Sequence, residues 1–454
     1  MTAMAAAASR TRDLLQAPLL PTLFRLATPN VIGLFATTIV IGYDGYILGR
    51  LGADALAGVA LVFPLSMLML QISAGGIGGA VTAGVARALG GGRAEDADRI
   101  AQHALLIATV LAAIFMLVML GFGGGIYRAM GGRDAALDAA LSYSTVLFGG
   151  SLLICLANIL AAIVRGAGNM VLPSAMLAGT AILHLFLCPL LVFGWGPVAG
   201  LGLAGAALST LGTNLVAAAV LLAYLSNGRA AVQLLRVRWE LRREFLRAIL
   251  RVGAPASLSP ILSNGSIAAA TALIGSYGTA ALAGYGVAAR LEYIMIPIAF
   301  GFGTALTTLV ATNMGAGQHE RALRATWTGG AVVAILTGII GIVAAIAPGL
   351  WMDLFSSDPE VLAIGSSYLR VVGGCYSLFG LGLALFFASQ GAGRMFWPLA
   401  GSVARLVVVT LGGWLAVHVW QVPASGFFVV IAAGFVIYAV MIAGAIRLGT
   451  WVRA

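Results

Sequence analysis

Continuous apolar segments of about twenty residues recur along this 454-residue chain, and they limit the folds available to it. The segment from Ala104 to Gly121, for example, contains no charged side chain. A membrane-spanning helix needs about 20 apolar residues, whereas strands of a membrane barrel alternate in polarity at every second residue. Only 9% of the residues are charged, against about 25% in soluble proteins. The sequence therefore predicts an all-α membrane protein and excludes a soluble enzyme, a nucleic-acid-binding domain and a disordered chain.

The net charge of +10 does not indicate nucleic acid here. Basic side chains accumulate in the cytoplasmic loops of membrane proteins, which explains the excess. The three cysteines, Cys155, Cys188 and Cys375, lie in apolar segments, so neither a disulfide framework nor a zinc site is expected. The sequence contains no lysine and hence no Walker-type phosphate loop. We therefore expect no ATP hydrolysis, no enzymatic activity, no metal and no organic cofactor.

Breaks at charged or Gly/Pro-rich positions divide the chain into twelve expected spans. They lie near residues 24–49, 54–86, 101–122, 139–163, 171–194, 200–225, 246–276, 280–311, 325–347, 360–388, 396–418 and 424–446. Several exceed 25 residues, so we expect tilted or kinked helices, or helices that extend beyond the bilayer.

Arginine positions predict the orientation of these spans. If the N-terminus is cytoplasmic, only Arg50, Arg128 and Arg133 fall in outer loops, and Arg290 and Arg370 fall within spans. All other arginines count with the cytoplasmic side. By the positive-inside rule, both termini face the cytoplasm, and we expect a multi-pass protein of the bacterial cytoplasmic (inner) membrane.

An internal repeat divides the chain into two halves. Three separate strings recur at offsets of 225 or 226 residues: 51–58 matches 277–284, 89–99 matches 314–324, and 165–173 matches 390–398. Because each half has an even number of spans, the halves share one orientation and are related by an axis along the membrane normal. Parallel repeats of this kind are typical of transporters that bind their substrate between the halves.

The expected parts follow from the spans and the repeat. They are a cytoplasmic leader (1–22), an N-terminal six-helix bundle (23–226), a basic cytoplasmic linker (227–245), a C-terminal six-helix bundle (246–446) and a cytoplasmic tail (447–454). The linker is rich in arginine, which favours contact with anionic lipid.

The order of the short motifs resembles that of the multidrug and toxic compound extrusion (MATE) transporters. The opening consists of Pro29 and Asp44 in the first span, followed by Gly49-Arg50-Leu51-Gly52 and Ala55-Leu56-Ala57. The resemblance covers essentially the whole chain and is to the branch with an acidic residue in the first span. It implies two bundles that export cationic, amphipathic drugs in exchange for protons or sodium.

The fifth span departs from that branch. The branch commonly carries Asn-x-x-x-Asp before a proline, whereas this sequence has His184-Leu-Phe-Leu-Cys188-Pro189. An amide and a carboxylate are thus replaced by an imidazole and a thiol. This puts in doubt the transfer of a two-carboxylate ion site to this chain.

Asp44 is the strongest candidate for a functional residue. It is the only acidic residue expected inside the first six spans, and an ionisable group there is costly and typically functional. A structural ion pair with Arg50 is the alternative interpretation. Ala270 is at the corresponding position of the second half, so the coupling is expected in the first half alone.

Several more polar residues of the first half are candidates for the same site. His184 and Cys188 share a helix face because they are four residues apart, and His184 is a candidate hydrogen-bond partner or second proton site. Pro29 removes a backbone hydrogen bond and predicts a kink in the first span. The remaining candidates for proton coupling or substrate binding, each better explained by helix packing when taken alone, are Tyr143, Asn158, Thr210 and Asn214.

Glu292 lies deep in the eighth span and is expected to need a partner of opposite charge. Arg290 is only two residues away and faces elsewhere on the helix, so Arg370 in the tenth span is the expected partner. We interpret Glu292 and Arg370 as a structural charge pair rather than as a second coupling site.

The predicted function is a secondary antiporter that exports organic cations in exchange for protons. Sodium is the less favoured coupling ion, because hard cations prefer oxygen ligands and the fifth span has lost two of them. The alternatives are a sodium-coupled transporter, a flippase for lipid-linked oligosaccharides and an assembly subunit without transport. The expected partners are small organic cations and membrane lipids, with no nucleic acid, and the protein is expected to be a monomer.

Overall fold

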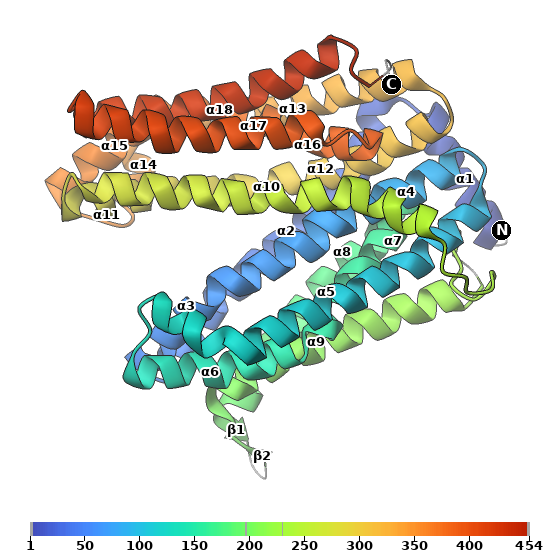
Figure 1. Ribbon diagram of the computed structural model, residues 1–454, viewed down its shortest axis with the longest axis horizontal. Coiled ribbons are helices and arrows are strands. Elements are labelled where there is room, and N and C mark those ends of the chain that lie inside the picture. Colours follow the sequence, from blue (N-terminus) through green and yellow to red (C-terminus); the bar gives the residue numbers. More distant parts are fainter. Residues whose placement is uncertain (1–2, 196–197, 229, 452–454) are drawn as a thin grey trace. The chain divides into compact units, whose positions relative to one another are not determined.

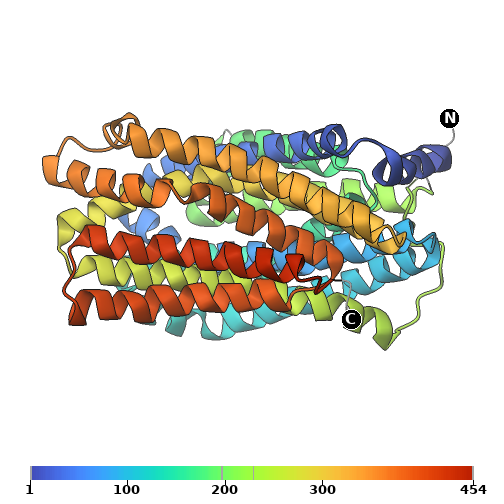
Figure 2. The ribbon, with the colours of Figure 1, turned by 90° about the horizontal axis from the view of Figure 1, so that it is seen from above.

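The computed structural model describes residues 3–195, 198–228 and 230–451 and is predominantly helical (Figures 1 and 2). In lipid, a helix satisfies every backbone N–H and C=O within its own segment, so apolar sequences of this length fold as helices. In the described part of the chain, ten continuous helical segments are long and apolar enough to cross a membrane, and two bent helix pairs bring the total to twelve. The prediction of an all-α, twelve-span protein is confirmed.

Contacts divide the chain into two compact units. The first comprises Met1–Gln16 and Thr28–Gly253, and the second comprises Ala17–Ala27 and Ala254–Ala454. The helices α2 (Leu19–Gly49) and α10 (Arg243–Gly275) therefore each contribute residues to both units.

The first unit contains the first half of the repeat. Its further elements are α1 (Ala3–Gln16), α3 (Ala53–Leu70), the π-helical stretch Gln71–Ile77, α4 (Gly78–Gly90), α5 (Ala94–Ala129), α6 (Asp134–Gly149), α7 (Ser151–Gly166), α8 (Val171–Phe193), β1 (Gly194–Trp195), β2 (Val198–Ala199) and α9 (Gly202–Ser226). The strands β1 and β2 form a short antiparallel hairpin that extends α8 (Figure 1). The helices α6 and α7 form one span that is bent by 49°.

The second unit contains the second half. Its further elements are α11 (Thr279–Ala289), α12 (Leu291–Gly315), α13 (His319–Ile346), α14 (Gly349–Met352), α15 (Pro359–Gly373), α16 (Tyr376–Ala392), α17 (Phe396–Val407), the π-helical stretches Val408–Gly412 and Leu415–Val419, and α18 (Ala424–Arg447). The helices α15 and α16 form a span bent by 53°. The red helices α17 and α18 lie side by side (Figure 2).

Individual contacts repeat between the two halves. The Thr82 hydroxyl donates to the Ala162 carbonyl at 2.9 Å, and the Thr307 hydroxyl donates to the Phe387 carbonyl at 2.9 Å, with both members of the pair displaced by 225 residues. Hydroxyl-to-backbone bonds of this kind hold helices together where lipid offers no competing water. The repeat detected in the sequence is therefore a repeat of packing contacts.

Two glycines of the repeat allow helices to approach closely. A Cβ atom at Gly58 would lie 2.6 Å from the Ala139 Cβ atom on α6, and one at Gly284 would lie 2.7 Å from the Val361 carbonyl oxygen on α15. Small residues at helix interfaces are the usual means of tight packing in membranes.

Candidate functional site

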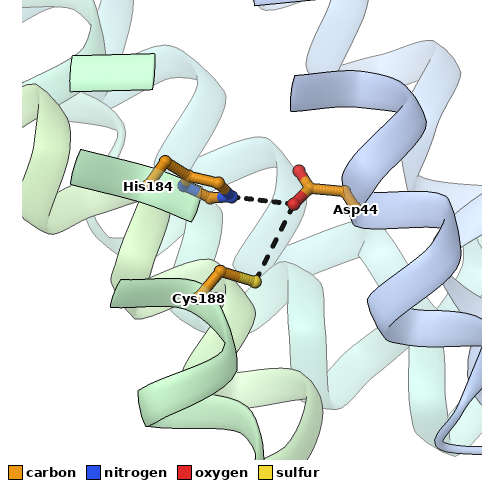
Figure 3. A group of neighbouring side chains, drawn as sticks. All are labelled: Asp44, His184 and Cys188. Atoms are coloured by element: carbon orange, nitrogen blue, oxygen red, sulfur yellow. Dashed lines mark hydrogen bonds and ion pairs between the residues drawn. The ribbon is translucent and has the colours of Figure 1, made fainter. Parts of the chain in front are cut away.

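Asp44 on α2 contacts two side chains of α8 (Figure 3). One carboxylate oxygen lies 2.7 Å from Nε2 of His184 and 3.8 Å from Sγ of Cys188. The Asp44 side chain is 29% exposed, whereas His184 and Cys188 are buried. The one-turn spacing predicted from the sequence thus places both α8 residues against the same carboxylate oxygen.

Ser209 on α9 completes the environment of the imidazole. Its hydroxyl lies 3.1 Å from Nδ1 of His184, on the opposite side of the ring from Asp44. If the imidazole is neutral with its proton on Nε2, it donates to Asp44 and accepts from Ser209. If it is protonated, both nitrogens donate and the Ser209 oxygen accepts. The same three side chains therefore accommodate His184 with one or with two protons.

Tyr43 connects α2 to α8 beside this group. Its hydroxyl donates to the Leu185 carbonyl at 3.0 Å. Leu185 is four residues before Pro189, and proline has no N–H, so the helix itself supplies no donor to that carbonyl. The Tyr43 hydroxyl supplies the missing donor and fixes α2 against α8 next to Asp44.

Tyr143 on α6 also belongs to this group. It lies within electrostatic range of Asp44 and Cys188 and interacts with Thr210 of α9. Tyr43 and Tyr143 both pack against the buried cluster of Ile47, Leu48, Cys188, Val192 and Ala206. The predicted candidates Tyr143 and Thr210 thus lie in the neighbourhood of Asp44.

Three more of the predicted candidates, Pro29, Asn158 and Asn214, do not contact Asp44. The Asn158 amide donates to the Ser73 hydroxyl at 2.9 Å, and the Asn214 amide donates to the Thr210 carbonyl of its own helix at 2.8 Å. Pro29 lies within α2, at the point where the helix enters the first unit. The structure shows neither Asn158 nor Asn214 in contact with Asp44.

Asp44, His184 and Cys188 bring three different kinds of metal-ligand atom close together. The nitrogen of His184, the sulfur of Cys188 and an oxygen of Asp44 lie within 4.8 Å of one another, a spacing that a metal ion could use. The hydrogen bonds to Asp44 and Ser209 account for the same arrangement through protons alone.

Glu292 on α12 has a different partner from the expected one. The Tyr368 hydroxyl of α15 donates to its carboxylate at 2.6 Å. The described ion pairs do not include one between Glu292 and Arg370, whose side chain is exposed. The predicted pair is therefore wrong: α15 turns Tyr368, two residues earlier, toward Glu292.

Arg405 on α17 is the cation that electrostatically faces Glu292. It is buried, and its guanidinium lies over the Phe435 ring at 4.5 Å from the centroid. The positive-inside count includes Arg405 among the cytoplasmic arginines although it lies inside the expected span 396–418, and the structure shows it buried on α17. A lone arginine near the start of an apolar segment does not reveal from the sequence which way it faces.

Comparison with known proteins identifies the family. The family described as MatE matches residues 29–190 and 255–415, one segment in each half of the repeat. A protein named FAD transporter from Shewanella oneidensis is 27% identical over 406 residues, covering 88% of each chain. A probable multidrug resistance protein, YoeA of Bacillus subtilis, is 25% identical over 399 residues, covering 87% of this chain and 86% of that one.

Solved structures share the fold. A structure described as MATE in the bent conformation has a TM-score of 0.89 at 24% identity and covers 97% of this chain and 98% of its own. An outward-facing multidrug resistance MATE transporter has a TM-score of 0.86 at 24% identity, with the same coverage of both chains. The duplicated fold and the two-segment match lead to one conclusion: this chain belongs to the MatE family of multi-pass membrane transporters.

Proposed function

We propose that this protein is a proton-coupled antiporter that exports cationic, amphipathic compounds across the bacterial cytoplasmic membrane, as a monomer with both termini in the cytoplasm. The observation that carries the proposal is the contact between Asp44 and His184, at 2.7 Å inside a membrane bundle. The relatives named as multidrug resistance proteins support drug export as the general activity.

The carboxylate of Asp44 is the exchanging group in this mechanism. When ionised, it accepts a hydrogen bond from His184 and attracts an organic cation. When a proton arrives from outside, the carboxyl becomes neutral, and the attraction for the cation is lost. Tyr43, Tyr143, His184 and Cys188 surround Asp44, which is the one carboxylate among these five residues.

Protons fit these neighbours better than sodium does. Sodium, like other hard cations, prefers several oxygen ligands. The immediate neighbours of Asp44 on α8 are instead an imidazole nitrogen and a thiol sulfur. They move or share a proton readily and make a poor sodium site.

The test uses purified protein in vesicles that contain a cationic dye. An imposed pH gradient should drive the dye uphill, whereas an inward sodium gradient at equal pH should not. Asp44→Asn keeps the size of the side chain and should abolish uphill transport while leaving insertion and thermal unfolding close to wild type. Asp54→Asn, ten residues later at the start of α3, is the matched control and should transport normally.

Two results would contradict the proposal. The first is uphill export by the Asp44→Asn variant at the wild-type rate, since Asp44 would then not couple. The second is sodium-driven export at equal pH. Transport should also be unchanged by a metal chelator, because protons alone occupy the group.

An anionic flavin dinucleotide is the second candidate substrate. The relative named FAD transporter covers 88% of both chains, which gives this candidate more weight than a lipid-linked oligosaccharide. Asp44 would repel the phosphates of a flavin dinucleotide, so we favour the cation. The same vesicle assay with FAD in place of the dye distinguishes the two candidate substrates. Uphill export of FAD without export of the dye would reverse the assignment. A flippase of lipid-linked oligosaccharides is the third candidate function, and it predicts neither activity.

A further inference from the structure

Arginine and large apolar side chains are exposed together where the linker meets α10. The arginine–tryptophan surface consists of Arg238, Trp239, Leu241, Arg243 and Arg247. Trp239 is 54% exposed and Leu241 is 61% exposed. Arg243 and Arg247 are four residues apart at the start of α10 and therefore lie on one face of this helix. The antiporter mechanism assigns no role to this surface.

Buried polar contacts hold the linker backbone against α5. Asp98, which is fully buried, accepts a hydrogen bond from the Gln233 backbone N–H at 2.8 Å and pairs with Arg236 at 2.6 Å. The Gln102 amide donates to the Leu234 and Val237 carbonyls, at 2.9 and 2.8 Å. The exposed side chains that follow therefore start from a fixed backbone.

His103 extends this attachment to the far end of the linker. Its Nε2 accepts from the Arg242 backbone N–H at 2.9 Å, while Nδ1 lies 2.7 Å from the Arg99 carbonyl oxygen. The attachment thus runs from Gln233 to Arg242 and includes the backbone on both sides of Trp239. The Trp239 ring lies against the His103 ring, at 5.4 Å between centroids, and Trp239 and Leu241 are both exposed on this held segment.

The linker arginines fall into two groups. Arg99 and Arg242 share the carboxylate of Glu240, at 3.2 and 2.7 Å, and the hydrogen bond from Arg242, followed by that from Arg99, lowers the pKa of Glu240. Glu240 therefore stays ionised at neutral pH. In contrast, Arg238, Arg243 and Arg247 form no ion pair with any described residue.

From these observations we infer that the arginine–tryptophan surface binds anionic phospholipid of the cytoplasmic leaflet. Basic residues next to a membrane span attract anionic headgroups, and tryptophan favours the boundary between headgroups and acyl chains. The helix α10 begins at Arg243 and continues as an apolar span, so this surface lies where such a boundary is expected. The arginines contact the phosphate, and Trp239 and Leu241 contact the upper acyl chain.

The test is native mass spectrometry of the delipidated, full-length protein in uncharged detergent, titrated with phosphatidylglycerol or phosphatidylcholine. Each interfacial arginine contributes about a fivefold gain in affinity for anionic lipid, so Arg243→Gln with Arg247→Gln should weaken phosphatidylglycerol binding roughly 30-fold. The matched control is Arg128→Gln with Arg133→Gln, which removes equal charge from the opposite end of α5. Trp239→Ser tests the apolar contact separately.

The proposal requires three results together: preference for phosphatidylglycerol over phosphatidylcholine, a loss in the Arg243/Arg247 variant, and wild-type binding in the control. Equal binding of the two lipids, or an equal loss in both double variants, overturns it. Displacement of the lipid by millimolar glycerol phosphate, with no effect of Trp239→Ser, also overturns it in favour of a site for a free phosphate. Matching thermal unfolding of all variants excludes misfolding, and Asp44-dependent transport is measured separately because the two proposals fail independently.

Discussion

Two side chains of α8 contact Asp44, and a missing backbone N–H in α8 fixes the position of the neighbouring residue Tyr43. Pro189 leaves the Leu185 carbonyl without a helical donor, and Tyr43, the residue before Asp44, fills the gap. A carbonyl in lipid cannot turn to water instead. The backbone of α2 next to Asp44 is therefore tied to α8 by a bond that both helices need.

Tyr43→Phe should destabilise the first unit and slow transport. It leaves the Leu185 carbonyl without its donor, and a buried polar group without a partner costs about 1–3 kcal/mol. Thermal unfolding in detergent and dye efflux in vesicles measure the two effects. Tyr46→Phe is the matched control, because Tyr46 is 64% exposed and should tolerate the change.

Repeating Tyr43→Phe in a Pro189→Ala variant tests whether the Leu185 carbonyl causes the loss of stability. Pro189→Ala restores the N–H that can bond to Leu185, so Tyr43→Phe should cost much less there than in the wild type. An equal cost in both backgrounds would show that the Tyr43 hydroxyl acts in some way other than on this carbonyl.

The sequence predicts part of this site. Asp44 stood out as a carboxyl in an apolar segment, and the four-residue spacing of His184 and Cys188 put them on one face. Ser209 and Tyr43 were missed, because one serine or tyrosine among many in apolar helices carries no distinguishing pattern. The usable signal was Pro189: a proline in a span leaves the carbonyl four residues earlier in need of a donor.

At the level of helices, duplication conserved packing and left the buried charges different in the two halves. Thr82 and Thr307 make equivalent bonds, and Gly58 and Gly284 make equivalent close contacts. The strings that match between the halves include Gly58 and Gly284 but not Thr82, Thr307 or any of the partners, so the structure was needed to show that these contacts repeat. The partner of Glu292 was not predictable in this way, because α12, α15 and α17 meet only after folding.

Glu292→Gln should impair the folding of the second unit more than turnover. The amide can still accept from Tyr368, but the negative charge that faces buried Arg405 is lost. Glu292 faces Arg405 without a direct ion pair among the described contacts, so we expect a cost below the about 3–5 kcal/mol that breaking a buried ion pair causes in soluble proteins. We expect less folded protein after purification and thermal unfolding at a lower temperature, with near-normal transport by the protein that folds.

A matched substitution separates charge from shape. Arg370→Gln removes an exposed arginine from α15 and should leave unfolding unchanged. A stable Glu292→Gln variant that has lost only transport would instead place coupling in the second unit.

For the whole transporter, the proposed proton coupling makes the energy source depend on how many protons Asp44 and His184 carry together. If only Asp44 exchanges a proton, export of a monovalent cation moves no net charge, and membrane potential has no effect. If His184 also loads a proton, each 100 mV adds about 2.3 kcal/mol to the driving force. That energy corresponds to about a 50-fold larger cation gradient at equilibrium.

We predict one proton per monovalent cation, and hence no response to membrane potential. A charged imidazole beside Asp44 would repel the organic cation, so a proton on His184 would oppose loading of the substrate. The measurement is the steady-state dye gradient in vesicles at a fixed pH difference, with potassium and valinomycin setting the potential. His184→Gln is the control, because its amide can still donate to Asp44 but does not titrate. If a potential that is negative inside the vesicles increases the dye gradient in the wild type but not in His184→Gln, then His184 carries the second proton.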